Sequence, residues 1–179
     1  MNREDILERL NKMDMEAFAT IDDENMYQVV IVGGSGLVLL GTISRATQDI
    51  DTLDASPAIR HLLEKYDANL RVSTYINHFP YNYEDRIEKL PAGGKKILFY
   101  AASLEDIVVA KLYSSRPVDR QDLISDEVLR NVNWRRLKHL ALDDDEAKAS
   151  ALNERSYQDF LFNYYEYVRR YGPHEDADI

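Results

Sequence analysis

The residues of this 179-residue chain that first suggest chemistry are two aspartates, Asp49 and Asp51, on either side of Ile50. On a strand, residues i and i+2 point to the same face, so Ile50 would face the core and both carboxylates would face outward. Two unpaired acids on one face repel each other unless a cation compensates them. Carboxylate oxygens suit Mg²⁺ or Mn²⁺. The pair therefore predicts a Mg²⁺ or Mn²⁺ site at Asp49 and Asp51.

A glycine-serine turn precedes this pair. An apolar, β-rich run over 29–32 ends in Gly33-Gly34-Ser35, and a short apolar segment over 36–40 follows. Glycine permits the positive φ of a tight turn. Backbone N–H groups at the start of a short helix favour an anion such as phosphate, and the Ser35 hydroxyl offers one more donor. The turn therefore predicts a phosphate contact.

Each signal alone also has a plainer explanation. A lone Asp-x-Asp most often marks a solvated strand end, and glycines between a strand and a helix often serve packing alone. A dinucleotide fingerprint is a further alternative, because 34–36 reads Gly-Ser-Gly. Its third glycine position is Leu39, however, and no ribose-binding acid ends a second strand about 20 residues on. The dinucleotide alternative is therefore disfavoured.

Taken together, Val32-Gly33-Gly34-Ser35 and the later Asp49-Ile50-Asp51 resemble the signature of the nucleotidyltransferase (DNA polymerase β-like) superfamily. The version here, GGSGLVLL…RATQDID, is most similar to small bacterial nucleotidyltransferase-like proteins, including abortive-infection toxins of type IV toxin–antitoxin systems. The resemblance implies an α/β (α+β) fold, with a nucleotidyltransferase-like mixed β-sheet flanked by helices and a C-terminal helical segment. It also implies that the aspartates bind the metal and that the turn holds nucleotide phosphates. The implied nucleotide-binding residues are Gly33, Gly34, Ser35, Arg45, Thr47 and Asp119.

A second block, LEDIVVAKLYSSRPVDRQDL, resembles another motif of the same bacterial proteins. Lys111 lies on the mostly apolar face of its predicted helix, where a lysine is costly unless it pairs with an anion or reaches solvent. The resemblance implies that Lys111 contacts phosphates or the site aspartates, and that Asp119 holds Lys111 or lies near it. Arg116 and Asp122 belong to the same motif. An ion-paired helix junction without a catalytic role is the alternative.

The superfamily usually carries a third carboxylate on a later strand. Asp85 and Glu88 are the candidates, and no motif fixes either of them. The family also usually has a basic residue before the first aspartate of the second block, where this chain has Val118. These departures keep open an inactive member of the fold.

Hydrophobic spacing and capping residues predict the elements. Residues 1–125 are predicted to form the nucleotidyltransferase-like domain, and 126–179 a helical extension packed on it. Helices are expected over 3–13, 37–40, 57–66, 126–131, 133–142 and 146–171. A further helix is expected to begin at residue 103. Strands are expected over 26–32, 85–90 and 96–100 and at the Asp49–Asp51 segment. Residues 70–75 are expected to form either a strand or an extension of the preceding helix.

Composition limits the partners. The net charge of -10 argues against sequence-blind coating of nucleic acid, which needs basic surface. The chain has no cysteine, which fits a reducing cytoplasm. No apolar run approaches the roughly 20 residues of a membrane span. A cytoplasmic protein without a membrane partner is expected.

These observations predict an enzyme that moves a nucleotidyl group from a Mg²⁺-bound nucleoside triphosphate to a hydroxyl of a protein, a tRNA end or a small molecule. Asp49, Asp51 and Lys111 are the expected catalytic residues. The alternative is a catalytically inactive binding or regulatory module of a toxin–antitoxin-like system. A cognate antitoxin or a second copy of the chain is a further expected partner.

Overall fold

The computed structural model describes residues 1–53, 55–70 and 76–173. They form two compact units: Met1–Thr74 with Arg86–Ser103, and Tyr75–Asp85 with Leu104–Ile179. The predicted segment 70–75 lies outside the described residues except for Leu70, as does the acidic tail 174–179. In the described part, no helix is long and apolar enough to cross a membrane.

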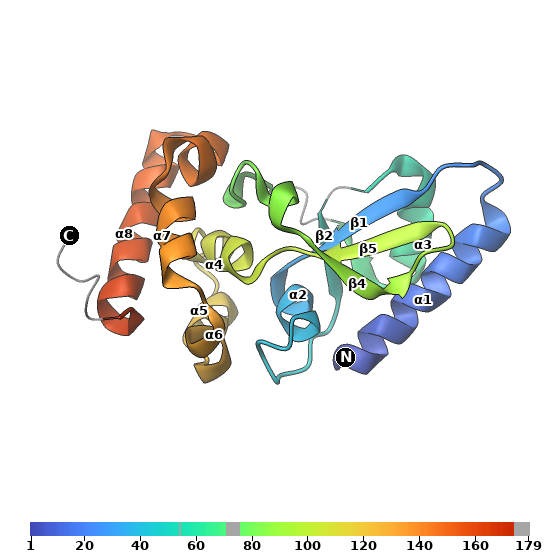
Figure 1. Cartoon of the computed structure of the whole chain (residues 1–179), viewed down its shortest axis with the longest axis horizontal. Coiled ribbons are helices and arrows are strands. Elements are labelled where there is room, and N and C mark those ends of the chain that lie inside the picture. The colour runs from blue at the N-terminus through green and yellow to red at the C-terminus, as the bar shows by residue number, and fades with distance from the viewer. Residues whose placement is uncertain (54, 71–75, 174–179) are drawn as a thin grey trace. The chain divides into compact units, whose positions relative to one another are not determined.

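The first unit is built on a five-stranded mixed sheet in the order β3-β2-β1-β5-β4 (Figure 1). Central β1 pairs parallel to β5 and antiparallel to β2, β2 pairs parallel to β3, and β4 pairs antiparallel to β5. The strands are β1 (Tyr27–Ile31), β2 (Ile50–Leu53), β3 (Ala68–Asn69), β4 (Glu88–Gly93) and β5 (Ile97–Ala101). The α/β (α+β) fold with a mixed sheet is thereby confirmed.

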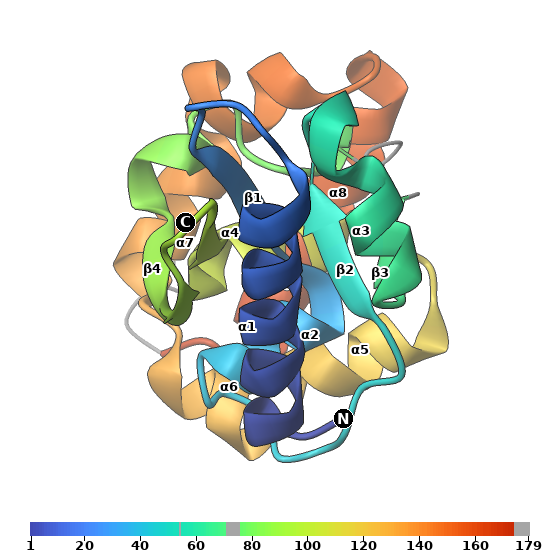
Figure 2. The same ribbon diagram turned by 90° about the vertical axis from the view of Figure 1, so that its right-hand side faces the viewer.

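Helix α1 (Arg3–Thr20) packs on β4 and β5 and lies beside α3 (Arg60–Lys65), as Figure 2 shows. Asn2 caps α1 in a capping box with Asp5, and the helix runs past residue 13, where the sequence predicted its end. The buried side chains of α1 recur at helical spacing: Ile6, Leu10, Met13 and Ala17. The remaining helical elements of this unit are α2 (Gly33–Leu39) and the 3₁₀ turn η1 (Pro57–Ile59).

A buried carboxylate on α1 fixes the β4–β5 turn. Asp14 is 3% exposed, and its oxygens accept from the backbone N–H groups of Lys95, Lys96 and Ile97 at 3.0, 2.7 and 2.6 Å. Lys96 belongs to the same turn, is only 5% exposed and pairs with Asp23 at 2.7 Å. The Lys96 ammonium and the Tyr27 hydroxyl lower the pKa of Asp23 to about 2.

The second unit is helical. The 3₁₀ turn η3 (Tyr83–Arg86) leads from its first segment into the sheet unit, and its main helices are α4 (Leu104–Leu112), α5 (Pro117–Leu123), α6 (Asp126–Asn131), α7 (Trp134–Leu142) and α8 (Glu154–Tyr171). A π-helical turn, η4 (Asp144–Lys148), separates α7 from α8. The single helix predicted over 146–171 is therefore divided, because Asn153 caps a new helix by accepting from the Ser156 N–H.

An aromatic core holds the second unit together. Tyr113 stacks between His78, at 5.2 Å, and Phe160 of α8, at 4.3 Å between ring centroids. The buried Tyr157 and Tyr167 hydroxyls donate to the Ala141 and Leu123 carbonyls of α7 and α5. The tyrosine-rich stripe of α8 thus packs on neighbouring helices of its own unit.

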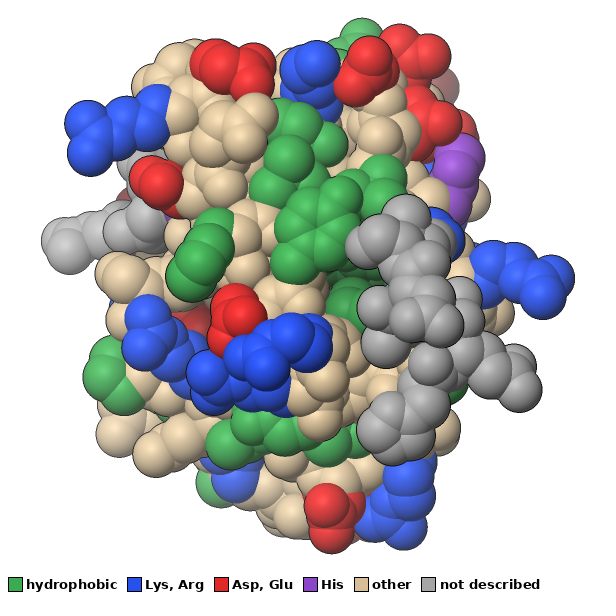
Figure 3. Space-filling model, turned by 90° about the vertical axis from the view of Figure 1, so that its left-hand side faces the viewer, with side chains coloured by type: hydrophobic (Ala, Val, Ile, Leu, Met, Phe, Trp, Pro, Cys, Tyr) green, Lys and Arg blue, Asp and Glu red, His purple; other side chains and the backbone are tan. Residues whose placement is uncertain are grey.

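The outer side of α8 carries apolar side chains. Phe162 is 69% exposed and Tyr165 is 49% exposed, and hydrophobic side chains gather in the middle of the face in Figure 3.

The border between the units falls at Ser103/Leu104, so α4 and α5 group with the later helices. A division by contacts does not test independent folding, and the domain boundary at 125/126 stays a prediction.

Candidate functional site

The glycine-serine turn forms the start of α2. The helix begins at Gly33, so it includes the glycine-serine turn at which its N-terminus was predicted as well as most of the segment 37–40, and Val32 precedes it in an extended conformation. Gly33 has φ of +62°, the left-handed region that favours glycine. The first N–H groups of a helix have no partner within it, so the turn presents backbone donors at its start.

The Asp51 carboxylate lies directly against this turn. A Cβ at Gly33 would lie 2.3 Å from Asp51 Oδ2, so the close approach requires glycine. The other carboxylate oxygen, Oδ1, accepts from Asn69 Nδ2 at 2.9 Å. The half-buried Asp51 is therefore held between the α2 turn and strand β3.

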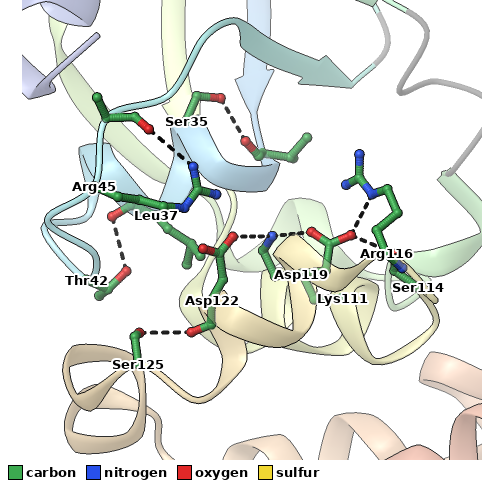
Figure 4. Close-up of polar contacts among 12 residues, drawn as sticks. Ser35, Leu37, Thr42, Arg45, Lys111, Ser114, Arg116, Asp119, Asp122 and Ser125 are labelled. Carbon is green, nitrogen blue, oxygen red and sulfur yellow. Dashed lines mark hydrogen bonds and ion pairs between the residues drawn. The ribbon is translucent and has the colours of Figure 1, made fainter.

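Ser35 connects the turn to β2. Its hydroxyl donates to the Val32 carbonyl at 2.9 Å and accepts from the Asp51 N–H at 2.9 Å. Figure 4 shows Ser35 pointing from the start of α2 with its hydroxyl bonded. Because the hydroxyl proton is engaged and the side chain is fully buried, donors to an anion here would be the backbone N–H groups.

Arg45 brings a cation to the same turn. A Cβ at Gly34 would lie 2.9 Å from an Arg45 guanidinium nitrogen, so Gly34 is needed for this approach. The guanidinium also donates to the Ala46 carbonyl at 3.2 Å (Figure 4). Gly33, Gly34, Ser35, Arg45 and Asp51, all predicted from the sequence, thus lie together in the first unit.

Asp49 and Thr47 stand just before β2. The strand begins at Ile50, which is fully buried between the half-buried Asp49 and Asp51, as the alternating pattern predicts. Thr47 is buried and donates from its hydroxyl to the Asp49 carbonyl at 3.2 Å. Within the described residues, the Asp49 carboxylate makes no hydrogen bond or ion pair.

The second block forms a buried ion network in the helical unit. Lys111, 5% exposed, pairs with Asp119 at 2.5 Å and with Asp122 at 2.8 Å (Figure 4). Asp119 also accepts from Ser114 Oγ at 2.6 Å and Arg116 Nε at 2.7 Å. The contact between Lys111 and Asp119 that the resemblance implies is present, and Asp122 is a second carboxylate on the same ammonium group.

The environment keeps Asp119 ionised. Burial alone would raise the pKa of Asp119, but the charge of Lys111 and hydrogen bonds from Arg116, Lys111 and Ser114 outweigh it and lower that pKa. Lys111 and Asp119 belong to the helical unit, while Asp49 and Asp51 belong to the sheet unit. Their convergence on one cleft stays a prediction.

The structure excludes one of the two candidates for a third metal-binding carboxylate. Glu88 lies on β4, three strands from β2, or about 14 Å at the usual strand spacing, which excludes its sharing an ion with Asp51. Asp85 belongs to the helical unit and is untested as a partner of the pair. Among the described residues, no group of three or more His, Cys, Asp or Glu side chains could hold a metal ion.

Sequence reasoning missed two polar residues of these clusters. Asn69 touches Asp51, but an isolated asparagine on a two-residue strand carries no pattern. Ser114 touches Asp119 from the loop after α4, and its neighbours Arg116 and Asp119 at i+2 and i+5 are the only sequence signal for that contact.

The comparisons with known proteins agree with this geometry at the level of the family. No curated protein and no solved structure matches the chain. A family model described as "Nucleotidyltransferase of unknown function (DUF6036)" matches residues 8–172, which include both the turn with its aspartates and the buried lysine network. The chain therefore belongs to this nucleotidyltransferase family.

Proposed function

We propose that the protein is a metal-dependent nucleotidyltransferase that moves a nucleotidyl group from a nucleoside triphosphate to a hydroxyl acceptor. The observation that supports it most is the contact between Asp51 and the α2 turn, with the half-buried Asp49 one residue before β2. This arrangement combines an anionic pair with backbone donors and the Arg45 cation. Those are the groups that a metal-bound triphosphate needs.

The donor set fits Mg²⁺ or Mn²⁺. Mg²⁺ is commonly held by one or two carboxylates, with substrate phosphates and water filling its remaining positions. Asp49 and Asp51 would supply the two carboxylates. When bound, the cation would neutralise charge on the phosphates and lower the pKa of the attacking hydroxyl.

The residues of the chain have separate tasks in this proposal. The backbone N–H groups of Gly34 and Ser35 bind the phosphates and fix their orientation, while Arg45 offsets their charge. The acceptor oxygen forms a bond to the α-phosphorus. The bond between the α-phosphorus and the oxygen that bridges to the β-phosphate breaks, and pyrophosphate leaves with that electron pair. The acceptor proton is lost to water. Lys111 is the further catalytic residue expected from the family resemblance, and in the structure its charge is directed to Asp119 and Asp122.

Labelled-nucleotide transfer in Mg²⁺ or Mn²⁺ tests this proposal. The Asp49→Asn and Asp51→Asn variants are expected to lose at least about 100-fold in transfer, because each removes one anionic ligand without changing side-chain size. Asp22→Asn, in an exposed loop of the same unit, is the matched control and keeps wild-type transfer. A wild-type protein that binds no metal–nucleotide complex contradicts the proposal.

The second candidate is an inactive module of the same fold that serves as a regulatory part of a toxin–antitoxin-like system. The lack of a third metal-binding acid among the described residues favours it. It predicts that the wild type binds Mn²⁺ with nucleoside triphosphate and transfers nothing to a cell extract of proteins, RNA and small molecules. Transfer that Asp49→Asn abolishes rejects the inactive module.

A further inference from the structure

Asn69 stands at a position that the proposed function leaves unexplained. Strand β3 has only two residues and pairs parallel to β2, with Asn69 opposite Asp51. The Asn69 amide donates to Asp51 Oδ1, and the Thr52 hydroxyl donates to the Asn69 carbonyl at 3.4 Å. The asparagine is thus attached to the aspartate strand by both its side chain and its backbone.

Asp51 is consequently fixed on three sides. Its N–H donates to Ser35, one carboxylate oxygen lies over Gly33, and the other accepts from Asn69. Asp49 has no such contacts within the described residues. The pair therefore consists of one preset carboxylate and one that is free to adjust, and Asn69 supplies the lateral contact that sets Asp51.

The chemical type of residue 69 also sets the charge of the site. Residue 69 stands opposite Asp51 on the neighbouring parallel strand, about 5 Å away at the usual strand spacing, which is close enough for the two side chains to share one ion. An aspartate there would give three carboxylates, whereas asparagine leaves two and offsets Asp51 with an N–H donor. Affinity for a hard cation rises with the number of charged ligands. A two-carboxylate site binds the free cation weakly and needs phosphate oxygens to complete its ligands.

We propose that Asn69 is a positioning residue that orients Asp51 and makes divalent-cation binding depend on the nucleotide. This inference rests on the proposed function, because it assigns Asp51 to the metal. It adds that the cation and the triphosphate bind together and that residue 69 determines this coupling.

Manganese binding, followed as the loss of the electron paramagnetic resonance signal of free Mn²⁺, tests the inference without turnover. The probes are Mn²⁺ alone and Mn²⁺ with α,β-methylene nucleoside triphosphates, whose α–β bridge is not cleaved. Asn69→Asp is expected to bind Mn²⁺ alone at least about 10-fold more tightly than the wild type, because a third carboxylate joins the pair. Asn11→Asp is the matched control: it adds the same charge in the same unit and keeps the acceptor for the Gly93 N–H.

Equal Mn²⁺ affinities of Asn69→Asp and Asn11→Asp overturn the inference, provided that Asn69→Asp retains the wild-type circular dichroism spectrum. If Asn69→Asp does not fold, Asn69→Ala decides. Loss of the contact to Asp51 is then expected to weaken binding of the Mn²⁺–nucleotide complex about 10-fold, and unchanged binding overturns the inference. Failure of the wild type to bind Mn²⁺ with nucleotide contradicts the proposed function itself, so the two failures are distinguishable.

Discussion

At the scale of single residues, close contacts between backbone and side chain define the candidate site. Gly33 and Gly34 each leave space that a larger residue would fill, for Asp51 and Arg45 respectively. Gly33 therefore serves two purposes, because it also adopts a left-handed conformation, whereas Gly34 serves the close approach alone. Sequence alone suggested the turn, whereas the contact with Asp51 depends on how β2 returns beside β1.

Gly33→Ala tests the contact with Asp51. The Cβ is expected to displace the carboxylate and to abolish binding of the Mn²⁺–nucleotide complex, while the left-handed backbone adds about 1–2 kcal/mol of strain. Gly41→Ala is the control, because Gly41 has φ of +72° and nothing lies within 4 Å of its added Cβ. Urea unfolding and Mn²⁺ binding measure both effects. Wild-type binding in Gly33→Ala would show that the position of Asp51 is unimportant.

Asp119→Asn tests the buried ion network. The change leaves Lys111 paired with Asp122 alone and replaces the charged acceptor of Ser114 and Arg116 with a neutral one. A loss of about 1–3 kcal/mol in the free energy of unfolding is therefore expected at neutral pH. Asp159→Asn, on the exposed side of α8, is the control and is expected to change the free energy of unfolding by less than about 0.5 kcal/mol.

The pH dependence of this loss follows from the lowered pKa of Asp119. A carboxyl whose pKa is lower in the folded protein stabilises it above the unfolded-state pKa, about 3.9. That stability is lost as pH falls through the lower, folded-state pKa. The free energies of unfolding of wild type and Asp119→Asn, measured with urea, are thus expected to differ by a constant amount near neutral pH. That difference is expected to become smaller below about pH 4. A constant difference at all pH values would contradict the ionised state of Asp119.

At the scale of elements, patterns within one segment were reliable, and features set by distant segments were not. The strand predicted over 26–32 and the helices over 126–131 and 133–142 match the structure closely. Strand β3 was missed, because two residues show no alternation and become a strand only by pairing with β2. The burial of Lys96 was missed because its partner, Asp23, lies far away in the sequence.

Helix α8 allows a matched test of packing. Phe160 is fully buried and stacks on Tyr113, whereas Phe162, two residues later, is 69% exposed. Phe160→Ala is expected to lower the free energy of unfolding by about 3–5 kcal/mol, because it leaves a cavity in the aromatic core. Phe162→Ala is expected to lower it by less than about 1 kcal/mol. If chemical denaturation shows that both variants lose the same free energy of unfolding, the exposed face of α8 is covered in solution.

At the scale of the whole molecule, the two units are interleaved along the chain. Residues 75–85 belong to the helical unit, and Arg86–Ser103 returns to the sheet unit. Sequence patterns do not show such a crossing, because each segment looks like an ordinary continuation of its neighbours. The predicted boundary after residue 125 separates α4 and α5 from α7 and α8.

Truncation after residue 125 tests that boundary. The shortened chain lacks Phe160, which stacks on Tyr113, and Asn163, whose amide donates to the Leu112 carbonyl. Amides of α4 are therefore expected to lose protection from hydrogen exchange, while those of β1 and β5 keep it. Full protection of α4 in the shortened chain would instead support a self-sufficient domain over 1–125.

The Ser35 hydroxyl has a consequence for how this site can change. It joins the end of β1, through the Val32 carbonyl, to the backbone of Asp51 on β2. The hydroxyl therefore couples the first turn of α2 to the aspartate strand. Because of this coupling, a ligand that displaces the turn is expected to displace the Asp51 carboxylate as well, without a rearrangement of the whole sheet.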